Sequence, residues 1–117
     1  MAILKIKNLR LKILIGVFDF EREKTQDIIV NIKIKFDDSE ASKKDDINFT
    51  IDYKELVDKI VLEVEKSNFF LLEKLSDFII DIIFEHQLVE KASVEIYKPN
   101  IIPNCDFVSI KKSSRKR

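Results

Sequence analysis

Residues 71–97, LLEKLSDFIIDIIFEHQLVEKASVEIY, change their hydrophobic period without an intervening Gly or Pro. The first half carries apolar residues at helical spacing, namely Leu71, Leu72, Leu75, Phe78, Ile79, Ile82 and Ile83. After His86, apolar and polar residues alternate, with Ala92, Val94 and Ile96 on one side. Spacings of three and four residues indicate an amphipathic helix, whereas strict alternation indicates a half-buried strand. This stretch therefore predicts a helix followed directly by a strand.

A second helix is expected from Tyr53 to Val64, where apolar residues again recur three and four positions apart. Asp52 and Glu55 stand at its start in the arrangement of a capping box, which supplies partners to the first backbone N–H groups. Ser67 and Asn68 separate the two helical stripes. We therefore expect two distinct helices joined by a short connection.

Two strands are expected before the helices, over residues 2–15 and 28–36, because apolar and polar residues alternate in both. The phase of the first run flips at Lys7–Asn8, which predicts a β-bulge or a kink there. Residues 19–26 and 37–50 are polar, so both are expected to be loops, the second with a turn at Asp45–Asp46.

A short last strand over residues 107–111 completes the order ββααββ. This order predicts an α+β fold, with a four-stranded antiparallel sheet and both helices on one face. The edges of such a sheet would be long and apolar, so self-association is expected. Residues 1–112 are expected to form a single domain. Residues 113–117 are expected to be a basic, disordered tail.

The composition restricts the possible functions. The chain has 117 residues, of which 36% are charged and 45% hydrophobic, as in a globular domain. A single Cys and a single His argue against a disulfide framework and a protein-only zinc site. The 21 basic and 21 acidic residues balance, and aromatic residues do not interleave with the basic ones, so nucleic-acid binding is not expected.

Membrane insertion is not expected either, because no apolar run approaches the roughly 20 residues of a membrane span. The first residues, Met1 to Lys5, alternate in charge too early for a signal peptide. The sequence therefore predicts a cytoplasmic protein.

Four polar residues are candidates for chemistry, and each has a simpler structural explanation. Glu73 lies near a predicted helix N-terminus, where an anion is favoured and a carboxylate can accept paired N–H donors, but it can also merely cap the helix. Lys98 ends a strand and can act as a base beside a carboxylate, or it can be an ordinary surface lysine. For Tyr53 the simpler explanation is a core residue, because its position fits the apolar stripe of the helix. For Glu21 it is a solvated charge, because the residue lies in a polar loop.

Five segments occur together in one order along the chain. They are Ile15-Gly16-Val17 with Glu21 and Gln26, Asp45-Asp46-Ile47, Thr50-Ile51-Asp52-Tyr53, Phe70-Leu71-Leu72-Glu73-Lys74-Leu75, and Lys98-Pro99. Together they resemble the dihydroneopterin aldolase family of folate biosynthesis, which includes dihydroneopterin triphosphate 2′-epimerase. The resemblance implies the tunnelling fold. It also implies a tetrameric barrel or stacked octamer with active sites at subunit interfaces.

The resemblance also implies a role for each site residue. Glu73 would bind the 2-amino and N3–H edge of a pterin, assisted by backbone groups of Leu71 and Leu72. Lys98 would be the general base, acting through water on the side-chain hydroxyl. Glu21 would help to position the triol chain.

Three further residues would come from the neighbouring subunit. Tyr53 would orient water and handle the proton at the cleaved carbon, and Thr50 and Ile51 would line the pterin slot. The reaction implied is a retro-aldol cleavage in which the N5=C6 imine of the dihydropterin accepts the electrons. Neither a metal nor a cofactor is therefore expected.

The segments divide between two activities of the family. Ile3 to Leu11 and Leu71 to Leu75 resemble the epimerase, whereas Val17 to Glu21 and Lys98 to Asn100 resemble the aldolase. Ile15 stands where many relatives have His, and Asn100 and Asn104 stand where relatives have a glycine. The sequence reading favours the aldolase, which yields 6-hydroxymethyl-7,8-dihydropterin and glycolaldehyde. The alternatives are the epimerase, a bifunctional enzyme, and a non-catalytic pterin-binding oligomer.

Overall fold

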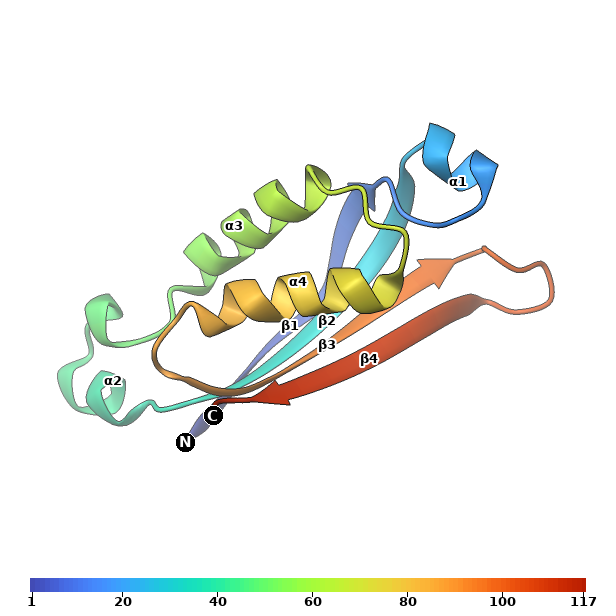
Figure 1. Cartoon of the computed structure of the whole chain (residues 1–117). Coiled ribbons are helices and arrows are strands. Elements are labelled where there is room, and N and C mark those ends of the chain that lie inside the picture. The colour runs from blue at the N-terminus through green and yellow to red at the C-terminus, as the bar shows by residue number, and fades with distance from the viewer.

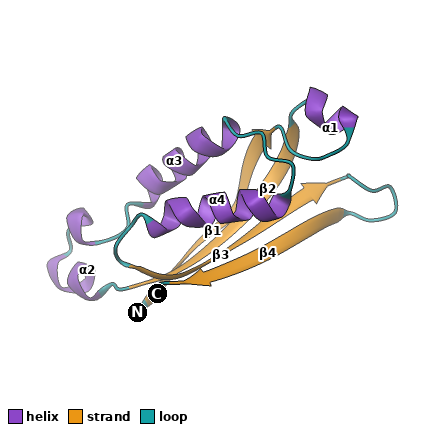
Figure 2. Ribbon diagram, viewed as in Figure 1, coloured by secondary structure: helices purple, strands orange, loops and turns teal.

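Four strands form one antiparallel sheet in the order β1-β2-β3-β4 in the computed structural model, which describes all 117 residues. They are β1 (Ala2–Ile13), β2 (Gln26–Phe36), β3 (Val89–Pro99) and β4 (Phe107–Arg115). Two helices, α3 (Tyr53–Glu65) and α4 (Leu72–Phe84), cover one face of this sheet (Figure 1). The other face carries no helix (Figure 2). The predicted α+β class, antiparallel sheet and placement of the helices are confirmed.

The core lies between the sheet and the two helices. Alternate residues of β2 are buried, from Ile28 to Ile34, and they face α3 and α4. Leu75, Ile79 and Ile83 of α4 are fully buried against them. Burying one such side chain contributes about 1.5–3 kcal/mol, so this alternation fixes which face of each strand meets the helices.

The predicted bulge is present in β1. Ile6 is opposite Ile32 and Leu9 is opposite Val30, so β1 has one residue more than β2 across this interval. Asn8 has a φ of 57°, and its backbone N–H donates to Oδ1 of Asn31 at 2.8 Å. The bulge thus returns the apolar residues of β1 to the covered face.

The two predicted loops contain short helices. Residues 19–26 include α1 (Asp19–Glu23), and residues 37–50 include α2 (Ser39–Lys44) and the 3-10 helix η1 (Ile47–Phe49). The turn expected at Asp45 is present, with a φ of 50° at the end of α2. These helices have at most six residues, too few for a hydrophobic period to show.

The last strand is longer than expected. β4 continues to Arg115, and Ser113, Ser114 and Arg115 pair with Ser93, Ala92 and Lys91 of β3. The expected disordered tail over residues 113–117 is therefore wrong for its first three residues. This part of β4 was not predicted because its polar residues show no apolar–polar alternation. Such residues are tolerated there because β4 is an edge strand with one uncovered face. No helix is long and apolar enough to cross a membrane.

Candidate functional site

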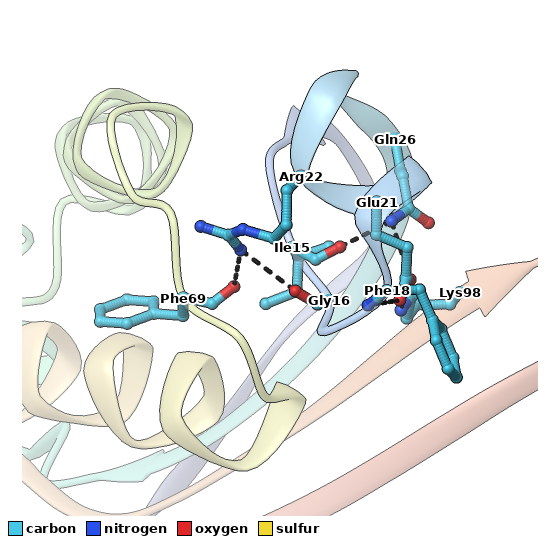
Figure 3. A network of polar contacts seen from close by, with 8 residues as sticks. All are labelled: Ile15, Gly16, Phe18, Glu21, Arg22, Gln26, Phe69 and Lys98. Atoms are coloured by element: carbon cyan, nitrogen blue, oxygen red, sulfur yellow. Dashed lines mark hydrogen bonds and ion pairs between the residues drawn. The ribbon is translucent and has the colours of Figure 1, made fainter.

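Glu21 and Lys98 form the centre of a polar cluster at one end of the sheet. Lys98 Nζ lies 2.5 Å from Glu21 Oε2, and the two side chains are 12% and 2% exposed. Gln26 Nε2 donates to the same Glu21 oxygen at 3.0 Å and to the Ile15 carbonyl at 2.6 Å. Figure 3 shows these side chains converging from α1, β2 and β3. Neither Glu21 nor Lys98 is therefore an ordinary solvated charge.

The protonation state of Glu21 follows from its partners. Burial by itself raises the pKa of a carboxyl group, because it disfavours the charged form. Hydrogen bonds from Lys98, Gln26 and the Phe18 backbone outweigh this effect and lower the pKa of Glu21 below its ordinary value of 4.5. Glu21 is thus held as a carboxylate beside the lysine, which gives the cluster an adjacent proton donor and acceptor.

Gly16 creates the space that the Glu21 carboxylate occupies. Its φ of 123° lies in a region that L side chains rarely adopt, and a Cβ at this position would overlap the carboxyl group of Glu21. The backbone N–H of Phe18 lies 3.4 Å from Glu21 Oε1. The chain between β1 and α1 therefore wraps closely around the carboxylate.

Arg22 connects this cluster to the segment that precedes α4. Its Nη1 donates to the carbonyls of Gly16 at 3.2 Å and Phe69 at 3.1 Å, and its Nη2 donates to the Asn68 carbonyl at 2.8 Å. The guanidinium also lies 4.2 Å from the ring centroid of Phe70 (Figure 3 shows Arg22 and Phe69). Arg22 was not predicted as a site residue, because its partners are carbonyls of a distant loop.

Glu73 lies in the first turn of α4, as predicted, and its side chain is exposed. Leu71 is the N-cap residue and makes no side-chain cap hydrogen bond. The first N–H groups of any α-helix lack intrahelical partners, so those of Leu72 and Glu73 point out of the helix end. This end of α4 offers N–H donors beside a free carboxylate.

Thr50, Ile51 and Tyr53 lie at the opposite end of the molecule. Tyr53 begins α3 next to η1, whereas α4 begins at the end near α1 (Figure 1). The 13 residues of α3 span about 20 Å at 1.5 Å per residue. Thr50 and Ile51 line a hollow of about 380 Å³ there. Tyr53 is 62% exposed, so the prediction of a core tyrosine is wrong.

The structure thus divides the predicted site residues into two groups. Glu21, Lys98, Leu71, Leu72 and Glu73 belong to the end of the sheet at which α1 lies, and Thr50, Ile51 and Tyr53 belong to the other. One chain does not bring the two groups together.

The chain is similar in sequence to proteins of known function. The family described as dihydroneopterin aldolase matches residues 4–112. Dihydroneopterin triphosphate 2′-epimerase of Escherichia coli is 39% identical over 109 residues, which cover 93% of this chain and 91% of that protein. Dihydroneopterin aldolase of Escherichia coli is 24% identical over 110 residues, covering 94% and 90%.

A solved structure agrees in fold. Escherichia coli dihydroneopterin aldolase in complex with neopterin superposes with a TM-score of 0.90 at 23% identity, covering 97% of this chain and 99% of that one. The tunnelling fold implied by the sequence is therefore shown. With the family match over residues 4–112, the conclusion is that this chain belongs to the dihydroneopterin aldolase family.

Proposed function

We propose that this protein is a dihydroneopterin triphosphate 2′-epimerase, which inverts C2′ of the side chain of its pterin substrate. The observation that carries this choice is the 39% identity to the Escherichia coli epimerase, against 24% to the aldolase of the same organism. Local segments at residues 17–21 and 98–100 favoured the aldolase. Identity along almost the entire chain outweighs two short segments, so the aldolase becomes the second candidate.

Lys98 is the proposed general base. Acting through water, it removes the proton of the C2′ hydroxyl, and the electrons of that O–H bond form the aldehyde C=O. The C1′–C2′ bond breaks, and its electron pair moves into the N5=C6 imine of the dihydropterin. Because the substrate provides its own electron sink, no metal or cofactor enters this proposal. The 2.5 Å contact with Glu21 fixes Nζ at the end of β3. As the base, Nζ acts in its neutral form, whose lone pair accepts the proton.

The two activities diverge after this cleavage. Re-addition of the aldehyde through its other face gives the epimer, whereas its release and protonation of C1′ give the aldolase product. In the triphosphate substrate, the phosphates are attached to the aldehyde fragment. Holding that fragment in place favours re-addition, and a tenfold preference needs only about 1.4 kcal/mol.

Glu73 is the proposed recognition group for the pterin. Its carboxylate can accept two parallel N–H bonds from the 2-amino and N3–H groups. The exposed N-terminus of α4 supports this role, because backbone groups at Leu71 and Leu72 lie beside the carboxylate. Glu21 would position the side chain of the substrate near Lys98.

We infer that the complete site forms between two chains in a homo-oligomer, a tetrameric barrel or a stacked octamer. Tyr53, Thr50 and Ile51 would come from the neighbouring subunit, because α3 holds Tyr53 far from the α1 end of its own chain. Exposed aromatic side chains at both ends of the molecule support such an interface. Phe18 and Phe70 at the α1 end are 61% and 59% exposed, and Tyr53 at the other end is 62% exposed. Covering such surface favours association.

The purified protein should convert 7,8-dihydroneopterin triphosphate to 7,8-dihydromonapterin triphosphate. Lys98→Ala should lose this turnover but still bind the substrate, whereas Glu73→Gln should bind it much more weakly. Glutamine presents an N–H₂ group to a donor, which costs about 1–3 kcal/mol for an unpaired buried group. A wild-type protein that turns over no dihydroneopterin compound would contradict the proposal, as would an equally active Lys98→Ala variant.

A further inference from the structure

The uncovered face of the sheet carries an unusual concentration of basic side chains. The strands bear Lys and Arg far more often than Asp and Glu, whereas α3 and α4 show the reverse. The formal net charge of the chain is nevertheless zero. Positive charge is thus concentrated on the sheet of an electrically balanced molecule, and α3 and α4 leave one face of that sheet uncovered (Figure 2).

Several of these charges stand directly opposite one another in the sheet. Lys5 is paired with Lys33, and Lys91 is paired with Lys35 on one side and Arg115 on the other. Like charges in this position destabilise a sheet. None of the five side chains takes part in any of the ion pairs of the structure. The fold therefore tolerates a repulsion that its own acidic residues do not relieve.

All of these side chains except that of Lys5 line a hollow of about 440 Å³. Its cationic lining consists of Lys33, Lys35, Lys91, Lys111, Arg115 and Lys116. Ser93 and Ser113, which pair across β3 and β4, add hydroxyl groups, and Glu90 is the acidic side chain of the lining. Such a lining offers many charged donors and few acceptors, which suits an anion of high charge and small volume.

This hollow is separate from the proposed pterin site. Lys91 precedes Lys98 by seven residues, about 23 Å of strand. Because successive residues of a strand face opposite sides, Lys91 lies on the uncovered face and Lys98 on the face of the helices. An anion bound at Lys91 therefore does not meet the Glu21–Lys98 pair.

We propose that the hollow on the uncovered face binds an oligophosphate, a short chain of linked phosphate groups. Its phosphoryl oxygens accept hydrogen bonds from the lysine ammonium groups and the serine hydroxyls, and its charge relieves the repulsion across the strands. A short phosphate chain concentrates several negative charges in a volume that the hollow accommodates. The site is independent of turnover at Lys98.

Calorimetric titration of the full chain with inorganic tripolyphosphate tests this site. The double variant Lys35→Gln with Lys91→Gln should bind at least about tenfold more weakly, because it removes two charged donors. A control with the same change of charge is Lys43→Gln with Lys66→Gln, at exposed positions outside the hollow. The control should bind like the wild type.

The fold of the double variant is checked by thermal unfolding. Its midpoint should be unchanged or higher than that of the wild type, because a like-charge pair has been removed. Its turnover of 7,8-dihydroneopterin triphosphate should match that of the wild type. Loss of tripolyphosphate binding can therefore be distinguished from loss of the epimerase activity.

Three results would overturn the proposal. They are the absence of tripolyphosphate binding, equal weakening in the control variant, and tighter binding of a single-stranded oligonucleotide than of tripolyphosphate. The last result would assign the face to nucleic acid.

Discussion

The carboxylate of Glu21 and the ammonium group of Lys98 are 2.5 Å apart, although 77 residues separate them in the chain. This ion pair joins α1 to the end of β3, and it is almost closed to solvent. A buried ion pair costs solvation energy, and removing one partner leaves an uncompensated charge. The Glu21–Lys98 pair therefore holds α1 against the end of β3 and also places two charged groups in the candidate site.

The stability of the protein should depend on pH through Glu21. Its pKa is lower in the folded chain than its ordinary value of 4.5, so the folded state releases this proton more readily than the unfolded state. The resulting stabilisation is present above pH 4.5 and is lost as the pH falls through the lowered pKa. Urea unfolding of Glu21→Gln at several pH values should show a weaker loss of stability in acid than the wild type. Equal acid sensitivity of both proteins would contradict this assignment.

Gly16→Ala should displace the Glu21 carboxylate and reduce turnover sharply. The new methyl group would overlap Glu21, and the positive φ alone should cost more than about 1 kcal/mol of unfolding free energy. Asn8→Ala is the matched control, because Asn8 also has a positive φ but lies in the bulge of β1. Both variants should lose stability in chemical denaturation, whereas only Gly16→Ala should lose activity. Full activity of Gly16→Ala would show that the position of Glu21 is unimportant.

Arg22→Met should lower kcat/KM by at least about tenfold, because it removes three hydrogen bonds from a charged donor that joins α1 to the loop before α4. We expect Arg22 to act as a positioning residue, so Arg22→Lys should recover part of this loss by restoring one charged donor. Steady-state kinetics well below the unfolding temperature separate this effect from instability. Lys24→Met, an exposed neighbour, should be unaffected. Equal activity of Arg22→Met and wild type would exclude the role.

The sheet and the two long helices were predictable because their apolar residues repeat over many positions. β2 and α4 each carry a continuous buried stripe, and even the bulge at Asn8 was visible as a change of phase. α1 and α2 were not predictable, because five or six mostly polar residues contain no hydrophobic period. The final residues of β4 were missed for the same reason.

The chemistry of the site was predictable only in part. Resemblance to the family indicated Glu21 and Lys98, but their spacing in the sequence contains no sign of an ion pair. Arg22 binds backbone carbonyls, which every residue has, so no residue type identified its partners. The separation of Tyr53 from Glu73 followed from the opposite directions of α3 and α4, which only the assembled fold reveals.

Mixing Tyr53→Phe chains with Lys98→Ala chains should restore activity if each site draws on two subunits. After random reassembly of a cyclic homo-oligomer, about one quarter of the sites would contain both native residues. Glu21→Gln mixed with Lys98→Ala is the control, because these two residues lie in contact within one chain and no mixed site is intact. Recovery in neither mixture would contradict the shared site.

The partition of 7,8-dihydroneopterin triphosphate between two products distinguishes an epimerase from an aldolase. Chromatography of one reaction mixture measures the C2′ epimer, 7,8-dihydromonapterin triphosphate, against 6-hydroxymethyl-7,8-dihydropterin. We predict an excess of the epimer of at least about tenfold, equivalent to 1.4 kcal/mol between re-addition and protonation. A predominance of 6-hydroxymethyl-7,8-dihydropterin would contradict the epimerase and identify an aldolase. Turnover of the unphosphorylated substrate alone would contradict the triphosphate as the substrate.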